Sequence, residues 1–176
     1  MLKKAFQHFW KKENQIGRTN KMVSDELIKQ TLESAKTIAM VGVSSVKKEV
    51  STNIKRRPSI IVMKYLQEFG YRVIPVNPFS AGKEIYGETV VAQLEDVAIP
   101  IDIVDVFRPS NEASMIARQA VKIGAKTLWL QYGIQNQEAQ KIIETANMIY
   151  ISNKCIKQEY QKLFLKMSPV FPALKT

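Results

Sequence analysis

The chain has 176 residues, of which 45% are hydrophobic, and its formal net charge is +10 at pH 7. A chain of this length can fold as one domain with a buried core, and its apolar runs are far shorter than the roughly 20 residues that a membrane-spanning helix needs. The N-terminal residues lack the apolar core of a secretory signal, and the single cysteine, Cys155, excludes an internal disulfide framework, so we expect a cytoplasmic protein.

Much of the positive charge lies in residues 1–21, where six basic residues stand against one acidic residue and aromatic residues lie among the lysines. Such a segment can be an arm that contacts nucleic acid or another protein, but its composition is also that of a flexible extension, which we favour. We therefore expect this N-terminal extension to be followed by a folded domain at residues 22–165 and a tail at residues 166–176.

In chain order, short apolar runs alternate with amphipathic stretches, which is the pattern of a parallel sheet covered by helices. Five of these runs indicate buried strands, at residues 37–43, 71–76, 101–107, 127–131 and 148–151. We therefore predict an α/β fold, with a Rossmann-like doubly wound sheet of about five parallel strands flanked by helices in a single domain. The strand order expected for this sheet is 3-2-1-4-5.

Helix starts are marked by residues that are typical of N-caps or of the first helical position: Ser24, Pro58, Ser110 and Asn136. A last helix is expected at residues 155–165. Residues 46–57 are polar, basic and aperiodic, which indicates an exposed loop. Residues 79–100 are expected to be irregular, with one helical turn around Leu94.

The turn at residues 42–45, directly after the first strand, is the first place to look for a ligand, because parallel sheets bind ligands beyond the carboxyl ends of their strands. Its hydroxyl and backbone N–H groups could hold a phosphate. A nicotinamide dinucleotide would instead require a glycine-rich turn and an acidic residue after the second strand. The turn contains only Gly42, and the second strand ends in Asn77, so an NAD(P)-binding redox enzyme or sensor is kept as an alternative.

No set of residues points to catalysis or to a metal site. The only histidine, His8, lies in the N-terminal extension, so neither Ser44 nor Cys155 has an evident base, and one cysteine with one histidine excludes a structural zinc. Asp102 and Asp105 point to opposite faces of their strand and cannot act as an acid and base pair. We expect both to form hydrogen bonds with neighbouring loops.

Several sequence motifs stand at the predicted strand ends, in the same order as in one known family: residues 41–44, 57–59, 70–78, 82–87, 102–108, 129–134 and 153–155. Through these motifs the chain resembles, from about Asp25 to Leu163, the small bacterial CoA-binding proteins related to the N-terminal domain of the succinyl-CoA ligase alpha subunit. The resemblance implies a Rossmann-like domain that takes CoA or an acyl-CoA across the carboxyl ends of its strands.

By this resemblance the following residues would surround the ligand: Gly42, Val43, Ser44, Ser45, Pro75, Asn77, Pro78, Lys83, Phe107, Arg108, Pro109, Gln131, Tyr132 and Gly133. Arg108 is the residue that we expect to contact a phosphate, because its guanidinium is a fork of donors at a strand end. The ligase domain that carries the phosphorylated histidine has no counterpart here, which implies binding without catalysis. A basic nucleic-acid or protein interaction module is the remaining alternative, and Cys155 is either an incidental cysteine or a partner of the CoA thiol.

Overall fold

The computed structural model describes residues 23–43 and 58–166. The expected extension, the expected loop at residues 46–57, Ser44, Ser45 and nearly all of the expected tail lie outside these ranges.

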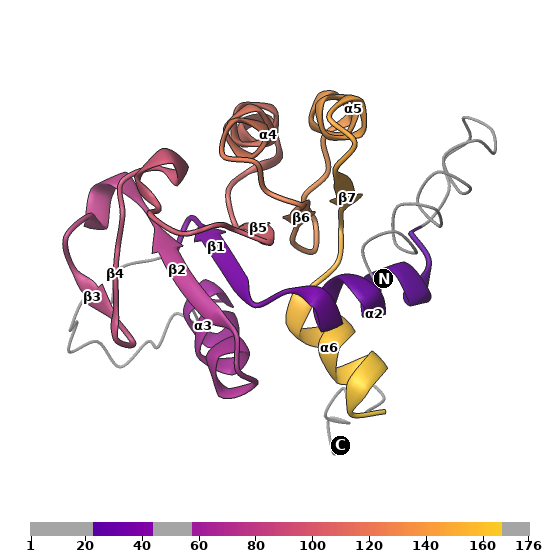
Figure 1. Ribbon diagram of the computed structural model, residues 1–176, viewed down its shortest axis with the longest axis horizontal. Helices are drawn as coiled ribbons and strands as arrows, with labels where there is room; N and C mark the ends of the chain where they lie inside the picture. Colours follow the sequence, from indigo (N-terminus) through magenta and orange to yellow (C-terminus); the bar gives the residue numbers. More distant parts are fainter. Residues whose placement is uncertain (1–22, 44–57, 167–176) are drawn as a thin grey trace, which may run out of the picture.

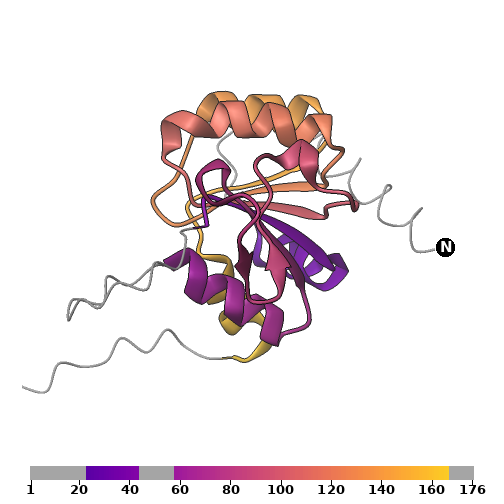
Figure 2. The ribbon, with the colours of Figure 1, turned by 90° about the vertical axis from the view of Figure 1, so that its left-hand side faces the viewer.

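Five parallel strands form one sheet: β1 (Thr37–Val41), β2 (Arg72–Val76), β5 (Ile103–Val106), β6 (Thr127–Leu130) and β7 (Ile149–Ile151). One face of the sheet is covered by α2 (Asp25–Ser34), α3 (Pro58–Glu68) and α6 (Ile156–Phe164), and the other by α4 (Ala113–Lys122) and α5 (Gln137–Thr145) (Figure 1). Figure 2 shows the same three layers from the side. The predicted α/β class, parallel sheet and single domain are confirmed.

The strand order is β2-β1-β5-β6-β7, so the predicted order 3-2-1-4-5 is wrong: the third long strand lies beside the first and leaves the second at the edge. Pro75 in β2 gives the physical reason. Its carbonyl accepts a hydrogen bond from Val91 N (3.0 Å) on the side away from β1. Another residue at this position would direct its backbone N–H to the same side, but proline has none. Because proline cannot donate to a neighbouring strand, this side of β2 suits a sheet edge.

The segment after β2 is more ordered than the sequence suggested. It contains η1 (Pro78–Ser80), the short antiparallel pair β3 (Glu84–Ile85) and β4 (Glu88–Thr89), and then η2 (Leu94–Asp96). The helical turn expected around Leu94 is confirmed by η2. A single bridge between Val76 and Val91 joins this segment to the outer side of β2 and so covers the exposed edge.

Alternate strand residues face the two helical layers, so the strands are apolar on both sides. The face toward α2, α3 and α6 buries Ile38, Met40, Val73, Ile103, Trp129 and Ile151. The face toward α4 and α5 buries Ala39, Val104, Val106, Leu128 and Leu130. Trp129 is 0% exposed and is among the largest fully buried side chains of this core.

Two of the predicted caps are confirmed and one is wrong. Ser24 Oγ accepts a hydrogen bond from Leu27 N (3.2 Å), and Asn136 Oδ1 accepts one from Ala139 N (2.8 Å). Ser110 does not cap α4, because the short helix η3 (Ser110–Glu112) precedes it. The Ser110 hydroxyl instead accepts a hydrogen bond from Gln135 N (3.2 Å) and so connects the loops after β5 and β6.

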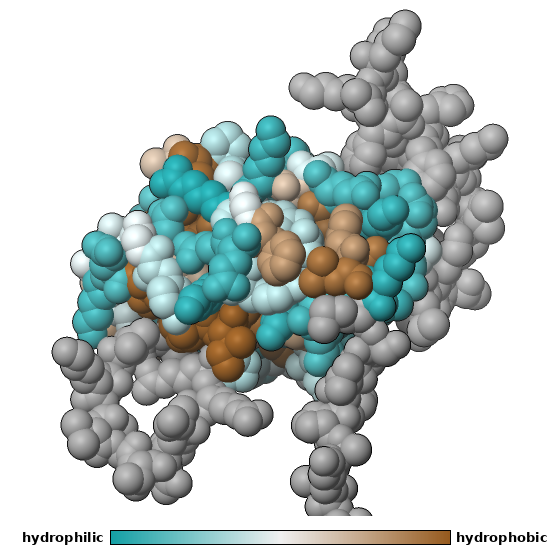
Figure 3. Space-filling view, turned by 90° about the horizontal axis from the view of Figure 1, so that it is seen from below, coloured by the Kyte–Doolittle hydropathy of each residue, from teal (hydrophilic) through white to brown (hydrophobic). Residues whose placement is uncertain are grey.

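Aromatic rings fill the groove between α3 and α6. Ring centroids are 4.7 Å apart for Tyr65 and Phe69, 4.7 Å for Phe69 and Tyr160, and 4.6 Å for Tyr160 and Phe164. Hydrophobic residues also reach the surface on the side of the molecule seen from below (Figure 3). Ile61 on α3 is 45% exposed. This helix pair therefore packs through aromatic contacts in addition to its contacts with the sheet.

Candidate functional site

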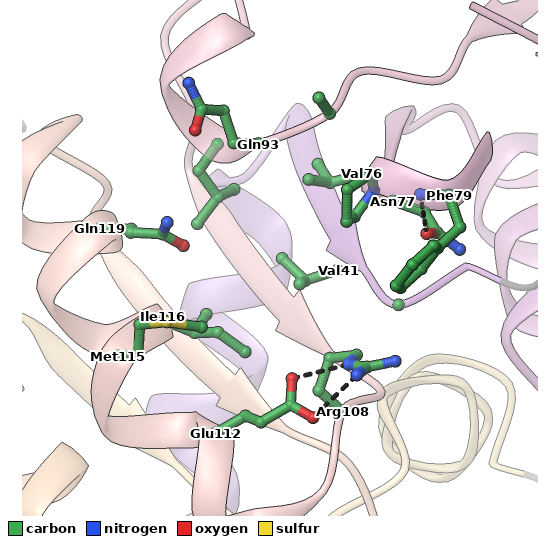
Figure 4. A pocket seen from close by; sticks show the side chains of 14 residues that line it. Val41, Val76, Asn77, Phe79, Gln93, Arg108, Glu112, Met115, Ile116 and Gln119 are labelled. Carbon is green, nitrogen blue, oxygen red and sulfur yellow. Dashed lines mark hydrogen bonds and ion pairs between the residues drawn. The ribbon is translucent and has the colours of Figure 1, made fainter. Parts of the chain in front are cut away.

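A cavity of about 290 Å³ opens at the carboxyl ends of β1, β2 and β5, beside α4 (Figure 4). It lies where the chain crosses from β2 on one side of β1 to β5 on the other, the switch point at which open parallel sheets bind ligands. Its lining residues are Val41, Gly42, Val76, Asn77, Pro78, Phe79, Ala92, Gln93, Leu94, Arg108, Glu112, Met115, Ile116 and Gln119.

The walls of the cavity are apolar and its rim is polar. Leu94 and Ile116 are buried, whereas Phe79 is 85% exposed at the mouth. Figure 4 shows the Gln119 side chain reaching from α4 toward the cavity, while the Gln93 amide already donates to Asp96 Oδ1 (3.3 Å). This arrangement suits a flat apolar ring that carries polar atoms at its edge.

Arg108 and Glu112 form a two-pronged ion pair at the rim. Arg108 Nε donates to Glu112 Oε2 and Nη2 donates to Oε1, both at 2.8 Å. The hydrogen bond with Glu112 raises the pKa of Arg108, so the guanidinium stays charged. Nη1 makes no hydrogen bond within residues 23–43 and 58–166. The N–H groups of Nη1 can therefore bind an anion while Nε and Nη2 stay bonded to Glu112.

Gly42 gives the Arg108 side chain room to cross the turn after β1. Its φ is +91°, and a Cβ atom at this position would lie 2.8 Å from Arg108 Cδ and 3.3 Å from the carbonyl carbon of Phe107. Gly42 N also donates to Val76 O (2.9 Å), which fixes the turn against β2. Both the backbone conformation and the close contact therefore require glycine here.

Asn77 links the turns after β1 and β2. Its Nδ2 donates to Val43 O (2.7 Å) and its Oδ1 accepts from Phe79 N (2.9 Å). Asn77 stands where a dinucleotide site would have an acidic residue. Both polar atoms of its side chain bond to the backbone of the cavity wall. Pro78 follows it in the lining, whereas Pro75 lies within β2 and Lys83 is exposed just before β3.

The cavity brings together four of the predicted site residues: Gly42, Asn77, Pro78 and Arg108. The residues after β6 lie elsewhere: Gln131 is 5% exposed, Tyr132 is 77% exposed, and Gly133 N donates to Asn153 Oδ1 (2.8 Å). Val43, Pro75, Lys83, Phe107 and Pro109 do not line the cavity either. Phe107 packs on the core cluster that faces α3 and α6.

Several lining residues were missed by the sequence interpretation: Gln93, Glu112, Met115 and Gln119. Glu112 could have been found, because it stands four residues after Arg108, a spacing that favours an ion pair in a helical turn. Gln93, Met115 and Gln119 stand in no sequence pattern that would mark them as cavity residues.

Asp102, directly before β5, and Asp105, within β5, have different surroundings. Asp102 Oδ2 accepts hydrogen bonds from Lys36 N (2.8 Å) and Thr37 N (3.1 Å), which confirms its expected role between segments. Burial raises the pKa of Asp102, but hydrogen bonds from Lys126 and these backbone groups outweigh burial and lower the pKa overall. Asp105 is 0% exposed, and burial raises its pKa to about 7.

The described residues lack both a membrane-spanning helix and a metal-binding cluster. No helix within residues 23–43 and 58–166 is long and apolar enough to cross a membrane. The same residues contain no group of three or more histidine, cysteine, aspartate or glutamate side chains that could hold a metal ion.

Comparison with known proteins identifies the family of this chain. A family model described as a CoA binding domain matches residues 36–161. The chain is 35% identical over 130 residues to the uncharacterized protein YneT of Bacillus subtilis (strain 168), an alignment that covers 74% of this chain and 89% of that protein.

Solved structures resemble the fold. A Thermus thermophilus protein described as cell-free ID.343 is 34% identical with a TM-score of 0.72, over 81% of this chain and all of that one. A dinucleotide forming acetyl-coenzyme A synthetase 1 from Ca. Korarchaeum cryptofilum, in complex with phosphate and ADP, matches with a TM-score of 0.53 and 18% identity, over 67% of this chain and 26% of that one. This second likeness shows a shared fold only.

Proposed function

The chain belongs to the family of CoA-binding domains, and we propose that it binds CoA or an acyl-CoA thioester in the cavity at the carboxyl ends of β1, β2 and β5. The observation that carries this proposal is the Arg108 guanidinium, which Glu112 holds at the cavity rim with its Nη1 N–H groups unused by that ion pair. Such a fork can bind a phosphate through charge-assisted hydrogen bonds.

The rest of the lining supports a nucleotide as the ligand. The apolar walls, with exposed Phe79 at the mouth, offer surfaces for an adenine ring, and the Gln119 amide can meet its polar edge. Because Glu112 neutralises part of the Arg108 charge, phosphate binding would depend on the geometry of the remaining donors as well as on charge.

We further propose that binding proceeds without catalysis by this cavity. Among the described residues, the charged side chains that line the cavity are Arg108 and Glu112, and they are paired with each other. The polar atoms of Asn77 are used within the fold. These groups shape and charge the site, and none of them is poised as a nucleophile or a base.

Calorimetric titration with CoA, acetyl-CoA, NAD and NADP tests the proposal. We expect CoA species to bind. The Arg108→Ala substitution should lower their affinity about 10- to 100-fold, because it removes a hydrogen bond between a charged group and the phosphate. Arg118→Ala is the matched control. Arg118, on α4, also forms an ion pair with a glutamate, Glu138, but it does not line the cavity. Binding of NAD or NADP alone, or equal effects of the two variants, would overturn the proposal.

A further inference from the structure

The part of the chain that the structure describes carries no net charge. Residues 23–43 and 58–166 contain 14 basic and 14 acidic residues, so the whole excess of +10 lies outside these ranges. Half of this excess lies in residues 1–22, where six basic residues stand against one acidic residue. A segment whose charge is set apart in this way from a neutral body points to an anionic partner for that segment.

Residues 1–22 also contain large apolar side chains among the basic ones. Phe6, Phe9 and Trp10 stand between the lysine pairs at residues 3–4 and 11–12. Lysines that flank aromatic residues are typical of segments that bind a membrane surface, where the ammonium groups meet anionic headgroups and the rings enter the layer below. A single-stranded nucleic acid also accepts lysines and rings, so the surface where this segment joins the fold has to decide between the two partners.

The segment joins the structure beside the end of α6. Asp25, the first residue of α2, lies next to α6, because Lys162 Nζ donates a hydrogen bond to Asp25 Oδ1 (2.7 Å). Leu165 directly follows α6 and is 40% exposed. Trp10 stands 13 residues before Val23. Because such a length of chain spans up to about 45 Å, the Trp10 ring can reach the surface formed by α3 and α6.

Exposed apolar side chains occur on this side of the molecule, which Figure 3 shows from below. Ile61 and Phe69 are exposed and stand four residues to either side of Tyr65, a spacing that places all three on one stripe along α3. Phe69 packs on the rings of Tyr65 and Tyr160, with both centroid distances 4.7 Å, and so connects the stripe to α6. We call Ile61, Phe69 and Leu165 the apolar ridge.

The charges around the apolar ridge do not repel an anionic surface. Helices α3 and α6 carry the lysines Lys64, Lys157 and Lys162 against the two glutamates Glu68 and Glu159. Exposed aliphatic side chains gain little from a nucleic acid, where binding depends on phosphate charge and on contacts with the bases. The same side chains gain free energy when they enter the boundary of an acyl layer. The ridge therefore favours a membrane over a nucleic acid.

We propose that the apolar ridge and residues 1–22 together dock the protein on an anionic phospholipid surface. Ile61 and Leu165 enter the boundary of the acyl layer, and the lysines of residues 1–22 meet the anionic headgroups. The sheet then lies behind α3 and α6, with α4 and α5 on the side away from the membrane (Figure 1). Because the cavity at the strand ends lies beside α4, it stays accessible in this orientation, and docking does not depend on CoA.

Sedimentation of the full chain with lipid vesicles tests the proposal. We expect vesicles of phosphatidylcholine with about one third phosphatidylglycerol to bind at least about tenfold more tightly than phosphatidylcholine alone, because each lysine near an anionic surface adds to the attraction. Tryptophan emission gives a second readout, since the chain has two tryptophans and Trp129 is 0% exposed. A shift of the emission to shorter wavelength on binding therefore reports that Trp10 enters the lipid.

Charge reversals separate the role of the segment from that of net charge. Lys11→Glu combined with Lys12→Glu should weaken binding to the anionic vesicles at least about tenfold. The matched control is Lys122→Glu combined with Lys141→Glu, which lowers the net charge by the same amount on α4 and α5. Because these two lysines lie on the other face of the sheet, the control should change the affinity less than about threefold (Figure 1).

Substitution of Ile61 tests the apolar ridge itself. Ile61→Gln should weaken binding to the anionic vesicles about three- to tenfold, because a polar amide replaces an aliphatic chain at the acyl boundary. Ile61→Leu is the control, since it keeps an apolar side chain of the same size, and it should bind as the wild type does.

Equal binding to the two kinds of vesicle, or no binding to the anionic ones, would overturn the proposal. Binding of DNA by a protein that leaves the anionic vesicles unbound would also overturn it and would assign residues 1–22 to nucleic acid. Equal losses in the two pairs of charge reversals, or equal affinities of Ile61→Gln and Ile61→Leu, would refute the combined docking surface. The comparison of the two vesicles uses the wild-type chain, so it decides the question even where a variant fails to fold.

Discussion

Replacing Gly42 by alanine tests how closely the turn after β1 fits the Arg108 side chain. The matched control is Gly70→Ala, because the two glycines have nearly the same φ, +91° and +89°. They differ in their surroundings: a Cβ atom at Gly42 would meet Arg108 Cδ at 2.8 Å, whereas nothing lies within 4 Å of one at Gly70. The difference between the two variants therefore isolates the steric contact from the backbone strain.

The expected magnitudes follow from these distances. A left-handed backbone costs an alanine about 1–2 kcal/mol, and this cost appears in both variants. At Gly42 the new methyl group would also lie 3.3 Å from the Phe107 carbonyl carbon, and that backbone is held by a bond from Phe107 N to Val41 O (2.9 Å). Overpacking of this kind adds about 1–3 kcal/mol. We expect Gly42→Ala to lose about 2–5 kcal/mol and Gly70→Ala about 1–2 kcal/mol.

Urea unfolding gives the two losses in stability, and calorimetric titration gives the affinity for CoA. Arg108 has to move away from the added methyl group, so we expect Gly42→Ala to bind CoA about tenfold more weakly while Gly70→Ala binds it as the wild type does. Equal destabilisation by the two substitutions would refute the close contact. An unchanged affinity for CoA in Gly42→Ala would refute the role given to the position of Arg108.

Three further predictions concern buried polar groups. Burial raises the pKa of Asp105 to about 7, so the folded state holds this proton more tightly than the unfolded state does. The free energy of unfolding should therefore fall as pH rises from about 4 to above 7, by at most about 4 kcal/mol. In Asp105→Asn this loss should disappear from urea unfolding compared at pH 5 and pH 8, and parallel losses in both proteins would contradict the assignment. Tyr71→Phe removes the buried donor to Leu32 O (2.8 Å) and should cost about 1–3 kcal/mol in urea unfolding, whereas an effect near zero would mean that this carbonyl finds another donor. Trp129→Phe removes the bond to Lys154 O and leaves a void in the core, so a loss of about 2–4 kcal/mol is expected, and an unchanged melting temperature would argue against close packing there.

Local signals in the sequence identified most helices and all five long strands. Ser24 and Asn136 act as the caps that their residue types predict, because an N-cap depends only on the next three residues. The valine- and isoleucine-rich runs correspond to strands that are buried on both faces. Ser110 shows the limit of such reasoning: its hydroxyl bonds to Gln135, which lies 25 residues further along the chain.

The position of β2 could have been inferred but was not. A proline within a strand is a local sign of a sheet edge, and Pro75 does lie on the edge strand. The predicted order 3-2-1-4-5 follows the usual order of dinucleotide-binding sheets without using this sign, so it placed the second strand inside the sheet and was wrong.

The α/β class, the parallel sheet and the family could be read from local patterns, because periodicity, caps and short motifs depend on residues that are near one another in the chain. The strand order, the segment that covers the outer edge of β2, and the cavity that joins Arg108 to residues of α4 and of the segment before η2 became visible in the folded chain. It also showed that Asp105 is buried and that its Oδ2 has no hydrogen-bond partner within the described part of the chain. These features arise from contacts between segments far apart in sequence, where many arrangements satisfy the same local pattern and packing selects among them.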